Sequence, residues 1–229
     1  RFPALEAVAN GYGLVETATV FMRWKGAGRR DLEGPTNVLS LTPGLGNELS
    51  VRNEEGASVA ANEEGELWVR GPSVVSGYLG TSEGFQDGWF RTGDVVRAID
   101  ATTVELRGRR KYLIKRGGKS ISPLVVQEAV DKTPGVRQSA VVGIPHPLFG
   151  EMIWAFVVRE LPSAQSQREG QVAVDLTAVM KTTRALLPAH MVPDRVEFVD
   201  AIPRGRGVGK VDREALIAQG SAILQKLGV

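Results

Sequence analysis

The chain has 229 residues, of which 42% are hydrophobic and 24% charged, with a formal net charge of +2. This composition is ordinary for a globular protein of one large or two small domains, and its small charge does not indicate nucleic-acid binding. The sequence contains no cysteine, which excludes a disulfide framework, a thiolate metal site and a cysteine nucleophile. Its two histidines are too few for a metal centre built from several histidines.

The chain starts at Arg1 rather than Met, which predicts a piece of a longer protein. Residues 1–108 consist mostly of short strand-like segments between turns. Polar and apolar residues alternate over 66–70 and over parts of 94–99 and 103–106, as in strands with one buried face. Turn-forming pairs such as Asp87-Gly88 separate these segments. We therefore expect a small β-barrel-like subdomain.

The pattern changes after residues 108–111, where we place the domain boundary. Residues 112–115 read as a strand, and Ser122 followed by Pro123 predicts the start of a helix that ends before Pro134. The later elements are expected as strands 139–144 and 152–158, a polar linker at 161–170, a helix at 174–187, a strand at 195–199 and a final helix after Asp212. This order is typical of a compact α+β domain with an antiparallel-rich sheet flanked by helices. No apolar stretch reaches membrane-spanning length and no secretory signal is visible, so we expect a cytoplasmic location.

Three side chains in the first domain suit nucleotide chemistry. Tyr12 lies between two glycines in the run NGYGLVET (10–17), where an exposed ring could stack on a planar base. Taken alone, Tyr12 is more often a core aromatic, and Asp94 an ordinary turn residue. Glu16 could hold magnesium through a carboxylate oxygen. Asp94 ends the run WFRTGD (89–94) after a tight turn, a position suited to accepting two ribose hydroxyls.

The run PRGRGVGK (203–210) places Lys210 after three closely spaced glycines and just before the cap of the last helix. One interpretation is a cation on a mobile hinge that is delivered to an anion elsewhere, and the other is an ordinary solvated loop. The run is not a phosphate-binding P-loop, because Arg204 replaces the first glycine and Val211 has no hydroxyl for magnesium.

The four runs together, including GRRKYLIKRGGKSISP (108–123), resemble the adenylate-forming superfamily of acyl-CoA synthetases, nonribosomal adenylation domains and luciferase-like enzymes. Stretches such as GELWVRGPSVVSGYLG (65–80) are similar to the AMP-forming acyl-CoA synthetases in particular. The resemblance implies that ATP activates a carboxylic acid to an acyl-AMP. The C-terminal domain then rotates, and the acyl group passes to a thiol of CoA or of a phosphopantetheine carrier.

The resemblance also implies roles for residues on the nucleotide side. Tyr12, with Gly13, would stack on adenine, and Glu16 would bind Mg²⁺ and take part in catalysis. Asp94 would hold the ribose of ATP or AMP, with Arg109 beside it.

On the mobile side, Lys111 would be the hinge. Lys210 would be the catalytic cation that neutralises charge at the carboxylate and α-phosphate. Gly117 and Gly118 would take its place after rotation and leave room for a pantetheine arm. By this resemblance, residues 1–108 are the distal part of the large adenylation domain and residues 109–229 the mobile C-terminal domain.

The family's phosphate loop and most of its acyl pocket precede the first of these motifs, and no segment here matches that loop. We therefore expect a C-terminal portion that needs a missing N-terminal half for activity. The sequence also carries Val15 and Val208 where the family usually has a hydroxyl residue, and Tyr112 where an acidic residue is common. Two alternatives stay open: a fatty-acyl-AMP ligase or carrier-loading domain, and a degenerate, non-catalytic nucleotide-binding or interaction module.

Overall fold

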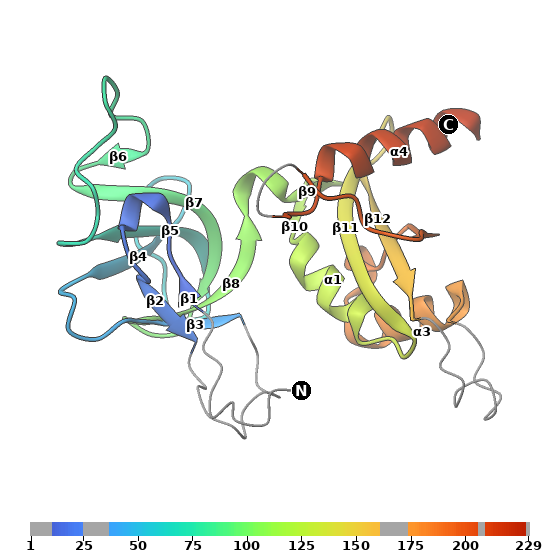
Figure 1. Cartoon of the computed structure of the whole chain (residues 1–229), viewed down its shortest axis with the longest axis horizontal. Coiled ribbons are helices and arrows are strands. Elements are labelled where there is room, and N and C mark those ends of the chain that lie inside the picture. Colours follow the sequence, from blue (N-terminus) through green and yellow to red (C-terminus); the bar gives the residue numbers. More distant parts are fainter. Residues whose placement is uncertain (1–10, 25–36, 161–173, 206–208, 228–229) are drawn as a thin grey trace. The chain divides into compact units, whose positions relative to one another are not determined.

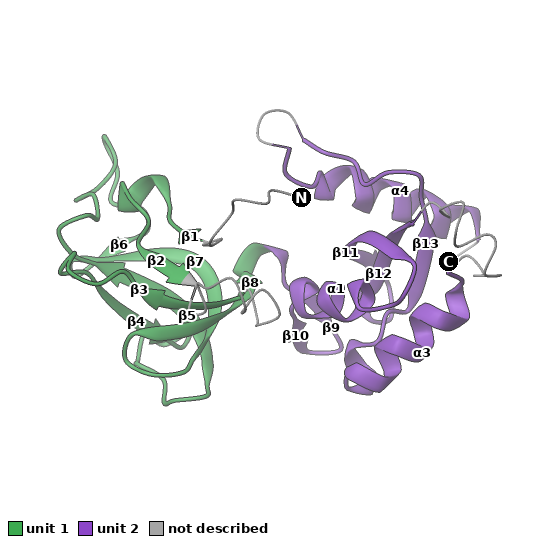
Figure 2. Cartoon of the chain, turned by 60° about the horizontal axis from the view of Figure 1, so that its bottom comes forward, with its two compact units in different colours: residues 1–111 green, residues 112–229 purple. Residues whose placement is uncertain are grey.

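The computed structural model describes residues 11–24, 37–160, 174–205 and 209–227 (Figure 1). The chain divides into two compact units, Arg1–Lys111 and Tyr112–Val229, which Figure 2 colours separately. Each unit is described by itself. The expected linker at 161–170 and Val208 lie outside the described residues. Within the described ranges, no helix has both the length and the apolar character needed to cross a membrane.

Unit 1 is an antiparallel sheet of eight strands in the order β1-β2-β3-β8-β7-β5-β4, with β6 added beside β7 (Figure 1). A short 3₁₀ helix, η1 (Val15–Thr17), follows the first strand. The strands are β1 (Gly11–Tyr12), β2 (Met22–Trp24), β3 (Val38–Leu41), β4 (Glu48–Arg52), β5 (Glu64–Arg70), β6 (Phe85–Gln86), β7 (Trp89–Ala98) and β8 (Thr103–Arg109).

The expected strands in this unit overlap β5, β7 and β8, and the sheet-rich fold is confirmed, but among the described residues the sheet does not close into a barrel. Strands β1 and β4 stand at the two ends of the strand order, and no ladder joins them among the described residues. A barrel requires its two edge strands to pair along a shared register, and β1 has only two residues for such pairing. The sheet is therefore open. Alternate residues of β7, such as Phe90 and Val96, point into one apolar core.

Unit 2 is an α+β domain built on a five-stranded sheet. Its strands run in the order β10-β9-β12-β11, and β13 pairs with β12 in parallel, the one parallel ladder among the described strands. The strands are β9 (Ile114–Arg116), β10 (Lys119–Ile121), β11 (Val136–His146), β12 (Gly150–Arg159) and β13 (Arg195–Phe198). The helices are α1 (Pro123–Asp131), α3 (Leu176–Leu186) and α4 (Arg213–Lys226), with a 3₁₀ turn η3 (Ala189–Met191), and the 3₁₀ turn η2 (Arg110–Tyr112) crosses the boundary between the units.

Side-chain caps start the helices where the sequence predicts them. The Ser122 hydroxyl accepts the Val125 amide at 3.3 Å, and Pro123 occupies the first helical position. Asp212 accepts the Ala215 amide at 3.0 Å at the start of α4. These bonds satisfy amide groups that have no partner inside the helix.

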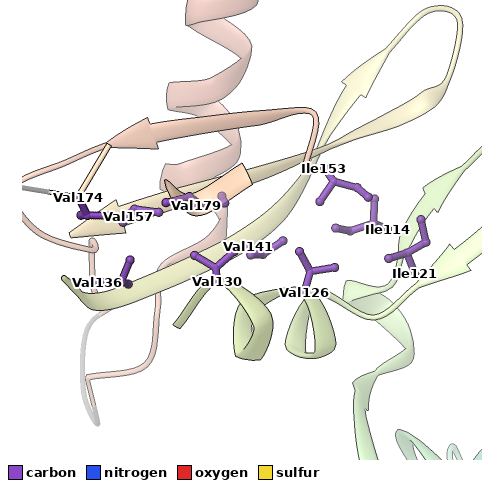
Figure 3. Close-up of a cluster of buried hydrophobic side chains, with 11 residues drawn as sticks. Ile114, Ile121, Val126, Val130, Val136, Val141, Ile153, Val157, Val174 and Val179 are labelled. Carbon is purple, nitrogen blue, oxygen red and sulfur yellow. The ribbon is translucent and has the colours of Figure 1, made fainter. Parts of the chain in front are cut away.

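The central strands β11 and β12 are buried on both faces. On one face, Val126 and Val130 of α1 pack with Val141 and Ile153 (Figure 3). On the other face, α4 covers side chains that include Trp154. Burial on both faces explains why these strands read as continuous apolar runs rather than alternating ones.

The sequence interpretation missed one hairpin. Strand β9 begins at Ile114, two residues later than expected, because η2 occupies Arg110–Tyr112. Strand β10 was not expected, and it pairs with β9 around Gly117 and Gly118, whose φ angles are +53° and +76°. Consecutive left-handed residues are what a two-residue hairpin turn requires, so this glycine pair shapes the turn.

Candidate active site

Tyr12 and Asp94 form the centre of the candidate nucleotide site in unit 1. The Tyr12 hydroxyl donates a hydrogen bond to Asp94 Oδ2 at 2.6 Å, which joins β1 to β7. Arg109, paired with Asp94 in the β7–β8 register, donates its Nε–H to Oδ1 at 2.7 Å. The Asp94 amide donates to Thr92 Oγ1 at 3.1 Å. Three predicted site residues therefore meet at one carboxylate, and Thr92 is a supporting residue that the sequence interpretation missed.

The structure gives the Tyr12 ring a burial between that of a fully exposed base-stacking ring and that of a core aromatic. Its side chain is partly buried and packs against the apolar core of unit 1. Burial disfavours the phenolate, and the negative charge of Asp94 adds to this, so the pKa of Tyr12 lies far above its ordinary value. The phenol therefore keeps its proton and acts as the donor to Asp94.

Gly13 has a packing reason to be glycine. A Cβ atom at this position would lie 2.5 Å from the backbone oxygen of Thr19, closer than real side chains approach. Any side chain would force apart the two chain segments that frame η1. Its predicted part in cofactor binding stays a prediction.

Glu16 lies in η1 and is held by a residue from a distant loop. The hydroxyl of Tyr78 donates a short hydrogen bond to Glu16 Oε1, and the Val75 amide donates to the Glu16 backbone oxygen at 2.9 Å. The hydrogen bond to Glu16 raises the pKa of Tyr78. Its neighbour Val15 is 91% exposed. Tyr78 is therefore a second supporting residue of the site. Its place in the sequence, in the GYLG stretch, does not predict this contact with Glu16.

The described residues contain no group of three or more acidic or histidine side chains that could hold a metal. This arrangement is compatible with Mg²⁺, which usually binds through one or two carboxylates and takes its other ligands from phosphates and water. Glu16 can supply one such carboxylate, and with it the ion would neutralise phosphate charge.

In unit 2, the Gly117–Gly118 turn is open and anchored at one side. The Gly117 amide donates to the Phe149 backbone oxygen at 3.0 Å, which ties the turn to the β11–β12 hairpin. Apart from chain neighbours, no atom of the described residues lies within 4 Å of where a Cβ would stand on Gly117 or Gly118. The turn therefore leaves free space on its outer side.

Lys210 stands on a loop whose base is closed by backbone pairing. The Gly205 amide donates to the Lys210 oxygen at 2.8 Å, the Asp212 amide donates to the Pro203 oxygen at 2.8 Å, and an isolated bridge joins Arg204 to Val211. Lys210 is exposed, and its side chain has no hydrogen bond or ion pair with the described residues. The base thus fixes the backbone at Lys210 while the ammonium group stays accessible.

The predicted hinge, Lys111, is exposed and is the last residue of unit 1. The next residue, Tyr112, is covered by Arg213, whose guanidinium carbon lies 4.8 Å from the ring centroid. Arg213 also donates to the Val141 oxygen at 2.8 Å, and burial lowers its pKa. The first residue of unit 2 is therefore tied to the first residue of α4, three positions after Lys210.

Comparison with known proteins gives two family matches. The AMP-binding enzyme family matches residues 1–79, and the AMP-binding enzyme C-terminal domain matches residues 126–210. Among curated relatives, the peroxisomal benzoate–CoA ligase of Arabidopsis thaliana is 32% identical over 97% of this chain and 41% of its own length. The feruloyl-CoA synthase of Amycolatopsis is 33% identical over 90% of this chain and 40% of its own length.

Among solved structures, ATP-bound MatB from Rhodopseudomonas palustris matches with a TM-score of 0.74 and 29% identity. The match covers 94% of this chain and 41% of the MatB chain. The chain thus spans about 40% of the length of these three proteins.

Proposed function

This chain belongs to the family of adenylate-forming, AMP-binding enzymes, and on that premise we propose that it is the C-terminal portion of an AMP-forming acyl-CoA synthetase. In the complete reaction a carboxylate oxygen attacks the α-phosphorus of ATP and pyrophosphate leaves. The thiol of CoA then attacks the acyl carbon and AMP leaves. Residues 1–108 would belong to the large adenylation domain and residues 109–229 would form the mobile domain, with Lys111 as the hinge.

The observation that carries this proposal is the carboxylate of Asp94. A carboxylate has about four acceptor positions, and the protein uses two of them, for Tyr12 and Arg109. The other two suit the paired hydroxyls of a ribose. The side chain of Asp94 is only 6% exposed, so the ribose hydroxyls would have to reach the small part of the carboxylate that stays open.

The remaining roles follow from charge and space. Glu16 would hold Mg²⁺ against the phosphates, and Lys210 would neutralise the charge that develops when the carboxylate attacks phosphorus. After the mobile domain rotates, the open turn at Gly117 and Gly118 would admit the pantetheine arm. This turn suits the pantetheine of CoA and that of a carrier protein equally. A domain that loads a carrier protein is therefore the nearest alternative function.

A second candidate function rests on Val15. This side chain is almost fully exposed beside Glu16, in the place where the family usually offers a hydroxyl to the phosphates. A valine there donates no hydrogen bond, which favours a nucleotide-binding module without catalysis. The two candidates agree on AMP binding and differ on turnover.

The first experiment titrates the chain itself with AMP and follows amide chemical shifts by NMR. We expect shifts at residues 12–16 and 92–94. Tyr12→Ala should weaken binding by about tenfold or more, since stacking of a base on an aromatic ring contributes roughly 1–3 kcal/mol. Tyr112→Ala, which removes an exposed ring of unit 2 outside the nucleotide site, is the matched control. Shifts confined to unit 2, or no saturable shift, would contradict the nucleotide site.

The second experiment tests turnover in a chimera in which this chain replaces the matching part of the Arabidopsis benzoate–CoA ligase. Benzoate-dependent release of pyrophosphate and formation of benzoyl-CoA are measured separately. Lys210→Ala should slow adenylation by about 100-fold or more, the usual effect of removing a group that stabilises developing charge. Val15→Thr should speed it. A folded chimera that binds AMP and yet never releases pyrophosphate, even with Val15→Thr, would favour the non-catalytic module.

A further inference from the structure

Glu66 is a buried carboxylate that the nucleotide site itself does not use. It lies in β5 and is 7% exposed. Its Oε1 accepts the Gly93 amide at 3.2 Å, and its Oε2 accepts Arg91 Nη2 at 2.8 Å and Arg110 Nη1 at 3.3 Å. A buried charge persists only where it is paired and hydrogen-bonded, and Glu66 meets both conditions.

The groups that Glu66 binds lie next to two residues of the proposed function. Gly93 immediately precedes Asp94, and Arg110 immediately precedes Lys111. Arg109, the residue before Arg110, forms an ion pair with Asp94 at 2.7 Å. Two consecutive arginines, Arg109 at the end of β8 and Arg110 at the start of η2, thus reach two buried carboxylates, one in β7 and one in β5.

We propose that Glu66 is a positioning residue that fixes the turn carrying Asp94 and the last residues before the hinge as one rigid piece. The roles of Asp94 and Lys111 rest on the proposed function, but the tie between Gly93 and Arg110 does not. Glu66 lets the chain rotate at Lys111 without loosening the ribose-binding carboxylate, because Arg110 stays bound to unit 1.

The other partner of Arg110 is a weaker anchor. Arg110 Nη2 also donates to Glu54 Oε1 at 3.1 Å, but the side chain of Glu54 is 81% exposed. Exposed ion pairs contribute little to stability, because water and salt screen them. The buried partner, Glu66, therefore holds Arg110 in place.

The experiment compares two substitutions that separate the two ties. Glu66→Gln removes the charge but keeps an oxygen that can accept the Gly93 amide, whereas Glu66→Ala removes both. By amide hydrogen exchange, Glu66→Ala should speed exchange at Gly93 about tenfold or more, and Glu66→Gln less than about threefold. Both variants should raise early tryptic cleavage after Arg110, relative to cleavage after Lys111, about fivefold or more.

Two matched controls test the assignment. Glu54→Gln removes the exposed partner of Arg110. Glu48→Gln removes an exposed carboxylate of β4 that pairs with Arg70 at 2.7 Å. Both should leave the Gly93 exchange rate and the Arg110 cleavage ratio within about twofold of the parent chain. The AMP affinity of Glu66→Gln, measured where its urea curve shows a fully folded chain, should fall about threefold or more.

The possible outcomes separate this proposal from the proposed function. Equal effects of Glu54→Gln and Glu66→Gln on cleavage after Arg110 would overturn it. So would a uniform increase in exchange across unit 1, with no excess at Gly93, which would mark Glu66 as a stabiliser of the sheet alone. If the parent chain does not bind AMP, the nucleotide site fails, while exchange at Gly93 and cleavage after Arg110 still decide the role of Glu66. If Glu66→Ala does not fold, Glu66→Gln decides the tie to Arg110.

Discussion

The phenol of Tyr12 reaches across 82 residues of sequence to donate a 2.6 Å hydrogen bond to Asp94. This bond connects a two-residue strand to the strand that bears the candidate ribose-binding carboxylate. Because Tyr12 comes just before η1, this bond also positions the run at 10–17, with Glu16, against the run at 89–94. The geometry of the nucleotide site therefore depends on a contact between two motifs that the sequence keeps far apart.

Tyr12→Phe tests that contact directly. The substitution keeps the ring and removes the donor, which leaves the buried Asp94 Oδ2 short of one partner. We expect a loss of about 1–3 kcal/mol in the free energy of unfolding, measured by urea denaturation. Tyr78→Phe, which removes a donor from the more exposed pair with Glu16, should cost less than about 1 kcal/mol. Equal losses for the two variants would show that burial at Asp94 adds nothing.

The raised pKa of Tyr12 predicts a pH dependence of stability. The folded chain holds the phenolic proton more tightly than the unfolded chain, whose tyrosines titrate near 10.0. The contribution is fully present below that pH and is lost as the pH rises through the folded-state pKa. Above pH 10 the slope should reach about 1.4 kcal/mol per pH unit for this single proton. The difference in unfolding free energy between the parent chain and Tyr12→Phe should shrink with rising pH in this range, and parallel curves would contradict the assignment.

Arg213→Met tests the tie between the start of unit 2 and α4. It removes the cation over Tyr112 and the bond to the Val141 oxygen while keeping a long side chain. We expect a loss of about 1–3 kcal/mol in unit 2, seen as faster hydrogen exchange in α4 and β11 and unchanged exchange in β5 and β7. Arg195→Met is the control, because Arg195 also lies over a ring, that of Trp154 at 5.1 Å, but among the described residues its side chain otherwise pairs only with Glu197, at 3.6 Å, and donates to no backbone oxygen. A larger effect for Arg195→Met would overturn this ranking.

Gly118→Ala separates the shape of the hairpin turn from its proposed use. Gly118 has φ +76° and Gly44, in a turn of unit 1, has φ +80°, and neither has an atom near its Cβ position. Alanine at either site should cost about 1–2 kcal/mol through left-handed backbone strain alone. In the benzoate–CoA ligase chimera, Gly118→Ala should slow formation of benzoyl-CoA and leave pyrophosphate release unchanged. Gly44→Ala should change neither step, and equal loss in both variants would argue against a role in thiol access.

Much of the fold was predictable because it depends on local sequence patterns. The cap at Ser122, the cap at Asp212 and the apolar runs of β11 and β12 depend on neighbouring residues or on a short period, and the structure confirms them. The α+β class of unit 2 and its antiparallel-rich sheet follow from the order of these elements. The open sheet in place of a barrel does not, because closure depends on how far-apart edge strands pair.

The candidate site divides in the same way. Its motifs, with Tyr12, Glu16, Asp94 and Lys210, could be named from residue type, spacing and the resemblance to the family. Their partners could not be named in this way. Tyr78 beside Glu16, the buried half of Tyr12 and the carboxylate of Glu66 follow from strand register and burial, which bring together residues that share no local pattern.

Residue types and local patterns in the sequence account for the chemical groups that are present, for where most helices and strands form and for the family that the chain resembles. The tertiary structure decided which of those groups are buried, which hydrogen bonds they make and how the segment before Lys111 is held to the strand that carries Asp94. The physical reason is one of range. Caps and periodicity act over one or two turns of chain, whereas pairing and desolvation of a carboxylate depend on residues that only the fold brings into contact.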